Sequence, residues 1–294
     1  MKTKIIAKTN KKLEESDSSK PSEVGKVSTD KYLELEKKIQ KLENLNQRLK
    51  LDNQKLKVTN EAKSEFISIA SHQLRTPLTS IKGFTSLLTE GAYGKLSHEK
   101  KEVLDKIYVS NERLITLVDN LLNIARIERG KMEYDFQKID VRDLVGNIVK
   151  VMRIQAKSKK LFLKLENKIK SELLIEVDRN KITEAIGNLV DNSIKYTEEG
   201  GITITLEKKS RFIKVAVSDT GIGIELDEVP KLFEKFSRGK EIHKLYTEGT
   251  GLGLFITKKI VEAHNGKVSV KSSGKEKGST FFIELPIKQK SNKK

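Results

Sequence analysis

Leucine recurs at every seventh position near the start of the chain, at Leu35, Leu42, Leu49 and Leu56. The alternate seam positions of the same repeat are Tyr32, Ile39, Asn46, Asn53 and Asn60. This heptad pattern predicts a coiled coil over residues 31–61, and asparagine recurring at the a position favours two parallel strands in fixed register. A single solvated helix is the alternative, but four leucines in phase favour the coiled coil.

The helical pattern continues from the heptads to a glycine-bracketed loop at residues 91–94. Along it, apolar residues step by three or four: Phe66, Ala70, Leu74, Pro77, Ile81, Phe84 and Leu88. His72 lies two positions from two members of this stripe, so at about 100° per residue it points to the opposite side of the helix. Pro77 cannot donate to the carbonyl of Gln73 and should bend or loosen the helix one turn after His72. We therefore expect an exposed imidazole beside a weakened turn, which suits a nucleophile, although an idle surface histidine fits the same pattern.

A second amphipathic helix follows the loop. Ser97 is a suitable N-cap, and the helical pattern runs to about Glu128. Its apolar face consists of Val103, Ile107, Leu114, Leu117, Leu121 and Ile124. The two helices form an antiparallel hairpin, and each is too apolar on one side to stand alone. Two hairpins from a dimer would close a four-helix bundle.

The chain changes texture after Gly130, where short strands alternate with helices. We expect helices at residues 141–155, from the Asp178 cap to about 195, and at 251–264. Strands are expected at residues 161–165, 173–177, 202–207, 212–218, 268–271 and 280–285. This order predicts an α/β sandwich with a mixed sheet over residues 135–287.

Composition limits the function classes. The formal charge of +17 suggests nucleic acid or an anionic membrane, but much of the lysine lies in the tails, 1–30 and 288–294, the first predicted to be disordered. Aromatic residues make up 5% of the chain and tryptophan is absent, so we expect no nucleic-acid partner. The absence of cysteine excludes disulfides and thiolate metal sites. Since no apolar run approaches the roughly 20 residues that span a bilayer, and no signal peptide is apparent, we expect no transmembrane segment and a cytoplasmic location.

Three polar clusters lie in the α/β segment. In the first, Asn188, Asn192 and Lys195 stand three or four residues apart and share one helix face. Amide oxygens are suitable neutral ligands for magnesium, and lysine offers a point charge to phosphate. Taken alone, this cluster also fits a polar helix face in contact with water.

The second and third clusters are rich in glycine. Residues 219–223, Asp-Thr-Gly-Ile-Gly, follow a strand; the carboxylate can accept a hydrogen bond from an exocyclic amine, and the glycines let backbone approach a flat ring. Residues 249–253, Gly-Thr-Gly-Leu-Gly, open a helix whose free N–H groups attract phosphate. The segment is neither a P-loop nor a dinucleotide fingerprint. Between the two clusters, a polar stretch that ends near residue 248 could close over a nucleotide as a lid.

The order of these clusters, with the histidine hairpin upstream, resembles a sensor histidine kinase. Residues 62–130 resemble the dimerisation and histidine-phosphotransfer domain, and residues 135–287 resemble the ATP-binding domain shared with GHKL-type ATPases. The resemblance implies ATP and Mg²⁺ as cofactors, a homodimer, and a response-regulator receiver domain as partner. It implies ATP-dependent phosphorylation of His72, followed by transfer of the phosphoryl group to an aspartate of the regulator.

The resemblance also assigns residues to roles. His72 matches the phosphoacceptor, with Gln73 and Thr76 beside it as further catalytic candidates. The implied nucleotide-binding residues are Asn188, Asn192, Lys195, Tyr196, Asp219, Gly221, Gly223, Arg238, Gly249, Gly251 and Gly253. Asn192 matches the magnesium ligand, and Asp219 matches the aspartate that reads adenine. The F-box phenylalanines match Phe233 and Phe236.

Gln73 departs from the family pattern, since most relatives of this type have glutamate directly after the histidine. When the imidazole attacks the γ-phosphorus, its other nitrogen becomes more acidic and its proton must be held or accepted. Glutamine can orient the ring but cannot accept the proton. The base is therefore unassigned, and dephosphorylation of a partner near Thr76 stays open for the same reason.

Two other function classes stay open at the level of sequence. A GHKL ATPase that forms no phosphohistidine would use the three clusters but gives no role to His72. A coiled-coil scaffold or nucleic-acid binder would use the charge of +17 but explains neither the glycine clusters nor the paired asparagines.

Overall fold

The computed structural model describes residues 23–237 and 250–288, and their side chains from residue 31 onward. Arg238, Gly249, the predicted lid and most of both predicted tails lie outside these residues. The chain forms two compact units, residues 1–62 and 63–294.

The first unit contains most of a long helix, α2 (Glu23–Thr89), which continues into the second unit. The helix agrees with the heptad prediction. The four heptad leucines are between 50% and 62% exposed in the single chain. Their pairing in a coiled coil stays a prediction.

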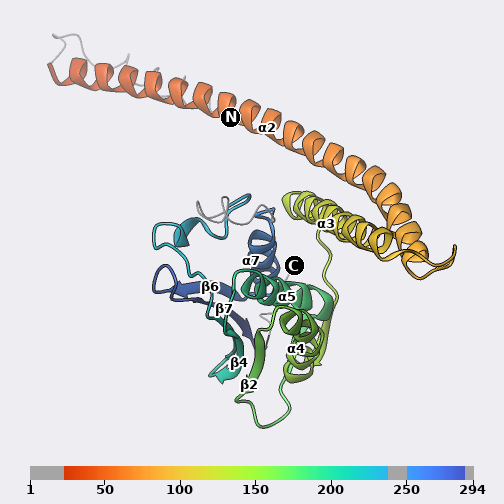
Figure 1. The fold of residues 1–294 in the computed structure, drawn as a ribbon. Helices are drawn as coiled ribbons and strands as arrows, with labels where there is room; N and C mark the ends of the chain where they lie inside the picture. Colours follow the sequence, from red (N-terminus) through yellow and green to blue (C-terminus); the bar gives the residue numbers. More distant parts are fainter. Residues whose placement is uncertain (1–22, 238–249, 289–294) are drawn as a thin grey trace. The chain divides into compact units, whose positions relative to one another are not determined.

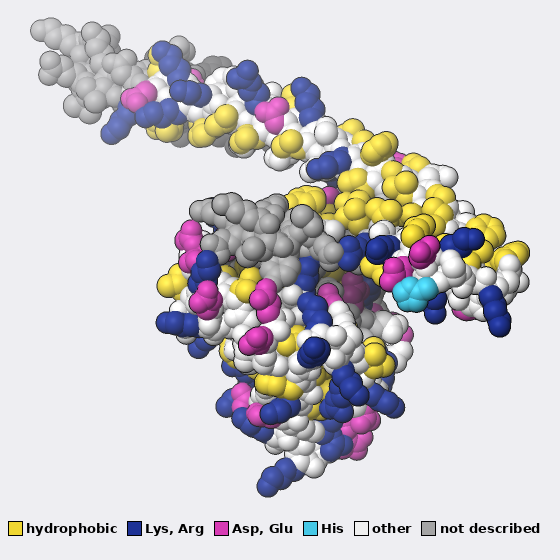
Figure 2. All heavy atoms as spheres, in the orientation of Figure 1, with side chains coloured by type: hydrophobic (Ala, Val, Ile, Leu, Met, Phe, Trp, Pro, Cys, Tyr) yellow, Lys and Arg dark blue, Asp and Glu magenta, His cyan; other side chains and the backbone are white. Residues whose placement is uncertain are grey.

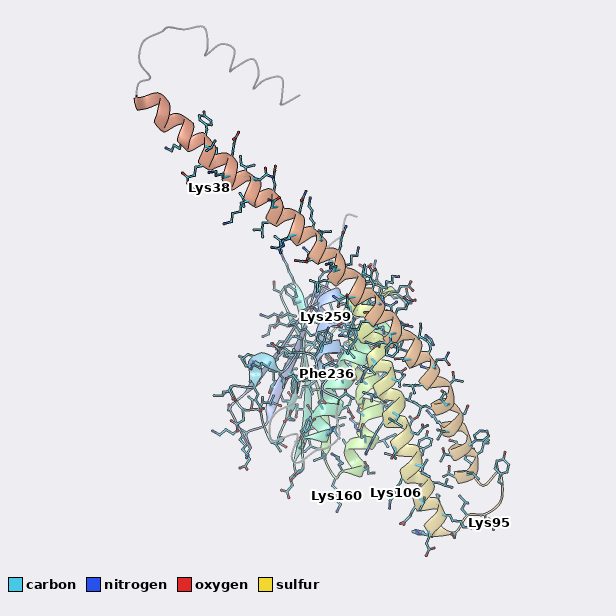
Figure 3. All side chains as sticks on the ribbon, turned by 90° about the horizontal axis from the view of Figure 1, so that it is seen from above. Lys38, Lys95, Lys106, Lys160, Phe236 and Lys259 are labelled. Carbon is cyan, nitrogen blue, oxygen red and sulfur yellow. The ribbon has the colours of Figure 1, made fainter. Side chains whose placement is uncertain are left out.

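In the second unit, the end of α2 and α3 (His98–Glu128) run antiparallel to each other, and the loop that carries Lys95 joins them (Figure 3). The predicted cap is confirmed, because the Ser97 side chain accepts a hydrogen bond from the N–H of Lys100. The helix continues through Pro77, so the expected weak turn is not a break. Hydroxyl groups support this region; Thr79 Oγ1, for example, donates to the carbonyl of Arg75 at 2.9 Å.

The face of α2 that meets α3 is largely polar. Arg75 forms an ion pair with Asp119, and Asn111 Nδ2 donates to the carbonyl of Leu78 at 2.8 Å. Lys82 Nζ lies 2.9 Å from a carboxylate oxygen of Glu112. The α2 residues buried here are small and polar: Ser64, Ser71 and Thr85.

The apolar stripe of α2 faces away from α3 and not toward it. Phe66 is 73% exposed, Phe84 62% and Leu74 52%. Figure 2 shows hydrophobic side chains gathered on the hairpin. His72 is also exposed, as expected from its position off the stripe. Small side chains let the two helices approach through their polar face, which leaves the bulky apolar face uncovered in one chain.

The α/β domain follows a linker after α3. Its helices are α4 (Val141–Ser158), α5 (Arg179–Lys195), the short η1 (Val229–Lys231) and α7 (Gly253–Ala263). Its strands are β1 (Phe136–Asp140), β2 (Phe162–Asn167), β3 (Leu174–Asp178), β4 (Gly201–Lys209), β5 (Phe212–Asp219), β6 (Lys267–Ser272) and β7 (Ser279–Pro286). The predicted helices and strands are present, but α4 ends three residues later and α7 begins two residues later than expected. Strand β1 was not predicted.

The main sheet has five strands in the order β2-β4-β5-β7-β6. Strands β2 and β4 are parallel and the other neighbours antiparallel, so the predicted mixed sheet is confirmed. Strands β1 and β3 form a separate antiparallel pair. Helices α4, α5 and α7 cover one face of the sheet (Figure 1). Alternate residues of β4, such as Ile202 and Ile204, are fully buried beneath them.

No helix within residues 23–237 and 250–288 combines the length and apolar character needed to cross a bilayer.

Candidate functional site

A cavity of about 940 Å³ lies at the C-terminal end of α5. It is lined by predicted site residues from three separate segments: Asn188, Asn192, Lys195, Tyr196, Asp219, Gly223, Gly251 and Gly253. Its size falls within the roughly 300–1,000 Å³ of small-molecule sites. Folding therefore brings together residues that are up to 65 positions apart in the sequence, from Asn188 to Gly253.

Helix α5 presents the first cluster to the cavity. The helix begins at Arg179, and the side chain of its N-cap residue Asp178 accepts a hydrogen bond from the N–H of Lys181 at 3.0 Å. Its apolar face is fully buried through Ile182, Ile186 and Leu189, which turns Asn188, Asn192 and Lys195 toward the cavity. A methyl group on Gly253 would lie 3.8 Å from the Asn188 side chain, so this face of α5 directly borders the start of α7.

Four hydrogen bonds hold the Asp219 carboxylate. Its Oδ1 accepts from the N–H groups of Gly221 at 3.0 Å and Ser279 at 3.1 Å. Its Oδ2 accepts from the hydroxyl of Ser279 at 2.7 Å and that of Ser193 at 3.3 Å. A carboxylate with fixed orientation and a wall position in a cavity can accept a further hydrogen bond from a bound amine.

Sequence reasoning missed Ser193 and Ser279. Ser193 directly follows Asn192 on α5, so its position in the first cluster could have indicated that it lies near the site. Ser279 follows Gly278, outside the three clusters, and only the pairing of β5 with β7 places it opposite Asp219.

The glycines of the second cluster allow close packing. A side chain at Gly221 would collide with the carbonyl oxygen of Tyr196 at the end of α5. Gly223 has a positive φ of 72°, and a side chain there would meet the carbonyl oxygen of Gly274. A larger residue at Gly221 would therefore push the segment after Asp219 away from the end of α5.

The described part of the third cluster leads into the N-terminus of α7. Gly251 has a φ of +68°, and a Cβ atom there would lie 2.8 Å from the backbone of Phe236. The N-cap residue of α7 is Leu252, whose apolar side chain makes no capping hydrogen bond. Free N–H groups at a helix start favour an anion, and Gly251 and Gly253 lie in the cavity wall.

Helix α3 forms a further wall of the cavity. Its contributing residues are Tyr108, Val109, Glu112, Arg113, Thr116 and Asn120. Contacts beyond the cavity also join α3 to the α/β domain: Glu128 pairs with Lys235, and Asn123 Nδ2 donates to Glu184 Oε1 at 3.0 Å. His72, Gln73 and Thr76 are not among the described residues that line the cavity. The cavity thus includes most of the predicted nucleotide-binding residues, but Gly221 and the predicted acceptor His72 are not in its lining, and Arg238 and Gly249 lie outside the described residues.

Asn192 is the predicted magnesium ligand of this site. The described ranges contain no group of three or more His, Cys, Asp or Glu side chains placed to hold an ion. Mg²⁺ commonly retains waters and takes one or two protein ligands together with substrate phosphates. The Asn192 amide in the cavity wall fits that requirement.

His264 is buried behind the start of α5. Its Nδ1–H donates to the carbonyl of Ile260 at 2.7 Å, and its Nε2 accepts from the N–H of Asp178 at 2.9 Å. Burial is the main cause of the lowered pKa of His264, so the neutral ring is favoured.

Two family models match the chain. Residues 62–130 match the His Kinase A (phospho-acceptor) domain. Residues 177–289 match the model described as histidine kinase-, DNA gyrase B-, and HSP90-like ATPase.

Curated relatives match over most of the chain. Sensory/regulatory protein RpfC of Xanthomonas campestris pv. campestris is 34% identical over 234 residues, which is 78% of this chain and 32% of the relative. Sensor histidine kinase WalK of Bacillus subtilis is 30% identical over 237 residues, 78% of this chain and 38% of the relative. The chain thus spans well under half the length of either relative.

Solved structures share the architecture. Full-length ShkA in complex with AMPPNP has a TM-score of 0.63 and 26% identity, covering 76% of this chain and 45% of that one. The histidine kinase AdeS of Acinetobacter baumannii, at 24% identity and a TM-score of 0.52, covers 74% of this chain and 98% of that one and supports the fold alone.

Proposed function

We propose that this chain, which belongs to the sensor histidine kinase family, transfers the γ-phosphoryl group of ATP to His72. A response-regulator aspartate is the proposed next acceptor. The observation that carries the proposal is the cavity in which Asn192, Lys195 and Asp219 meet the start of α7. Its chemistry suits both ends of ATP, with a carboxylate for the adenine amine and cationic or N–H groups for the phosphates.

The residues of the α/β domain that line the cavity each have a role in this proposal. Asp219 accepts a hydrogen bond from the adenine amine, and its four existing donors fix the direction of that bond. Lys195 and the first N–H groups of α7 stabilise the negative phosphates. Asn192 supplies an amide oxygen to Mg²⁺, which when bound neutralises phosphate charge.

The transfer step uses the exposed imidazole of His72. One ring nitrogen forms a bond to the γ-phosphorus while the bond from that phosphorus to the bridging oxygen breaks, and ADP leaves with the electron pair. The proton on the other ring nitrogen must be held or released. Gln73 is exposed beside His72 and can orient the ring, so solvent is the proposed proton acceptor.

His72 does not belong to the described lining of the cavity, so transfer requires movement of the α/β domain relative to the hairpin. The ion pair of Lys235 with Glu128 and the bond of Asn123 to Glu184 must open or shift in that movement. Before that movement, a nucleotide bound in the cavity would face α3.

A second copy of the chain is the proposed cover for the exposed apolar surfaces. The heptad leucines are half exposed or more in one chain, and so are Phe66, Leu74 and Phe84 of the α2 stripe. Surfaces of this kind mark association sites. The proposal therefore includes a homodimer, with a coiled coil at residues 31–61, a four-helix bundle at 62–130, an ATP-binding domain at 135–287, and activity in the cytoplasm.

Incubation with γ-labelled ATP tests the function. Phosphohistidine is stable to alkali and labile to acid, so label with that behaviour on the wild-type chain is expected. His72→Ala should carry no label while still binding ATP, and His98→Ala, at an exposed histidine of α3, should be labelled normally. Label retained on His72→Ala would remove His72 from the reaction.

The separation of His72 from the cavity also fits an ATPase that forms no phosphohistidine. Such a protein would release labelled phosphate at the same rate from wild type and His72→Ala. The same experiment therefore decides between the two functions.

A further inference from the structure

The last turn of α5 has an unusual set of hydrogen-bond partners. The final carbonyl groups of a helix have no partner within it. Here the carbonyl of Asn192 accepts from the N–H of Tyr196 at 3.0 Å, and that of Ser193 accepts from the Thr197 hydroxyl at 2.7 Å. The next two carbonyls along the chain are those of Ile194 and Lys195.

The ammonium group of Lys159 bonds to both. Its Nζ donates to the carbonyl oxygen of Ile194 at 3.1 Å and to that of Lys195 at 3.2 Å. Lys159 is the C-cap residue of α4, where its own N–H donates to the carbonyl of Ala156 at 3.1 Å. The end of one helix thus supplies the cation that closes the end of another.

A second contact supports the same junction. One turn earlier on α4, Gln155 Nε2 donates to Asp191 Oδ1 at 2.8 Å. The carbonyl of Tyr196, directly after the helix, accepts from the N–H of Ile222 at 3.1 Å. The last turn of α5 is therefore held between α4 and the segment after Asp219.

This turn carries part of the proposed nucleotide site. Asn192, Lys195 and Tyr196 lie on this turn and line the cavity. Gln155 and Lys159, which contact the turn from α4, line the cavity too. The C-terminus of a helix is the negative end of its dipole, which opposes the approach of a triphosphate. A lysine ammonium at that end both completes the hydrogen bonds and offsets the negative potential.

We propose that Lys159 is a positioning residue of the nucleotide site. It fixes the last turn of α5, and so holds Asn192, Lys195 and Tyr196 in the geometry that binds ATP. The inference rests on the proposed ATP site. A direct contact between Lys159 and a phosphate is the competing role, because Lys159 also lines the cavity.

Three variants of the full chain test the proposal. Lys159→Met keeps the length of the side chain but removes the charge and the donors, and Lys159→Arg keeps both. Lys157→Met is the matched control, because it removes the same charge from the same helix at a residue that is not among the described lining of the cavity. Amide hydrogen exchange of residues 192–197 is measured without nucleotide, and ATP affinity by equilibrium binding.

Lys159→Met should speed exchange in the last turn of α5 by about threefold to tenfold and weaken ATP binding by a similar factor. Lys159→Arg should restore both, and Lys157→Met should change neither.

Weaker ATP binding with unchanged exchange would overturn the proposal in favour of direct contact with the nucleotide. Unchanged binding with faster exchange would also overturn it, because the turn would then not control the site. Wild-type protein that binds ATP but carries no label on His72 would refute the kinase proposal alone, since the affinity comparison does not need phosphorylation.

Discussion

The Nε2 atom of His264, at the end of α7, accepts a hydrogen bond at 2.9 Å from the backbone N–H of Asp178, the residue that caps α5. The rings of Tyr134 and Phe136 pack against the imidazole, with centroids 5.4 and 4.9 Å away. Asp178 Oδ2 also accepts from the N–H of Asp135 at 2.9 Å. The segment that follows α3 is therefore fastened to the α/β domain around one neutral histidine.

This junction predicts a loss of stability in mild acid. Burial lowers the pKa of His264 from its usual 6.5, so the unfolded chain takes up the proton at a higher pH than the folded chain. The contribution of neutral His264 to the free energy of unfolding is complete above pH 6.5. It is lost as the pH falls through that value toward the lower pKa of the folded state. The Tm of wild type should therefore fall more steeply than that of His264→Gln between about pH 7 and pH 5. Equal slopes would show that another group controls the acid response.

Asp219→Asn should weaken ATP binding. An amide can turn its NH₂ toward the adenine amine or toward the N–H groups of Gly221 and Ser279, and either choice loses hydrogen bonds. Loss of a hydrogen bond to a charged group costs about 1.5–3 kcal/mol, or roughly 10- to 150-fold in affinity. Equilibrium binding of ATP and GTP measures the effect, with a melting curve to confirm folding. Unchanged ATP affinity and unchanged discrimination would place adenine reading elsewhere.

Asn192→Asp should impair phosphorylation although the side chain keeps its size. A carboxylate in this wall adds negative charge beside the triphosphate and alters the metal balance, so a fall of about tenfold or more in Mg·ATP turnover is expected. Asn147→Asp is the control, because it makes the same change at an exposed position of α4. Normal turnover of Asn192→Asp across a magnesium titration would exclude Asn192 as the ligand.

Gln73→Glu should speed phosphorylation of His72. General-base assistance is worth about 10²–10⁴-fold, and an exposed carboxylate beside His72 would be ionised near neutral pH and able to supply part of it. Single-turnover rates at several pH values compare the variant with wild type. If Gln73 only orients the ring, the two rates should match. A slower variant at every pH would indicate a site built around the neutral amide.

Phe84→Ala should weaken self-association without destabilising the hairpin of one chain. Phe84 is 62% exposed on the α2 stripe, so little packing within the chain is lost. Truncating an apolar anchor in an interface costs about 1–4 kcal/mol. Sedimentation equilibrium measures the dimer dissociation constant. Ile154→Ala, at a 78% exposed residue of α4, serves as control, and equal dissociation constants for wild type and both variants would place the interface elsewhere.

Local signals in the sequence predicted most elements because they depend on neighbouring residues. Ser97 and Asp178 mark helix starts through side-chain caps that form within three residues. Strand β1 was not predicted, because only Ile139 among its first four residues is buried. The strand therefore lacks the alternation of buried and exposed residues that marks a strand in the sequence. Its place in the fold depends on pairing with β3, more than thirty residues away.

The partner of an apolar face is harder to predict than the face itself. The three- and four-residue spacing correctly indicated a stripe on α2, but spacing cannot distinguish a face that packs on α3 from one left exposed. The polar contacts of Arg75 and Asn111 with the facing helix decide the matter, and each joins residues more than thirty positions apart. Ser279 was missed for the same reason: the pairing of β5 with β7 brings it to Asp219 from 60 positions away in the sequence.

The bond between Asp219 and Ser279 spans 60 residues, and this separation sets the order of events during synthesis. Ribosomes add about 5–20 residues per second, so Asp219 is made roughly 3–12 seconds before the serine that supplies two of its four donors. Because strand β7 is the last strand, it must then insert between β5 and β6. The cavity wall around Asp219 is therefore among the last parts of the domain to form. A chain cut short before Ser279 would carry all three predicted nucleotide clusters yet leave the Asp219 carboxylate with only two of its four donors.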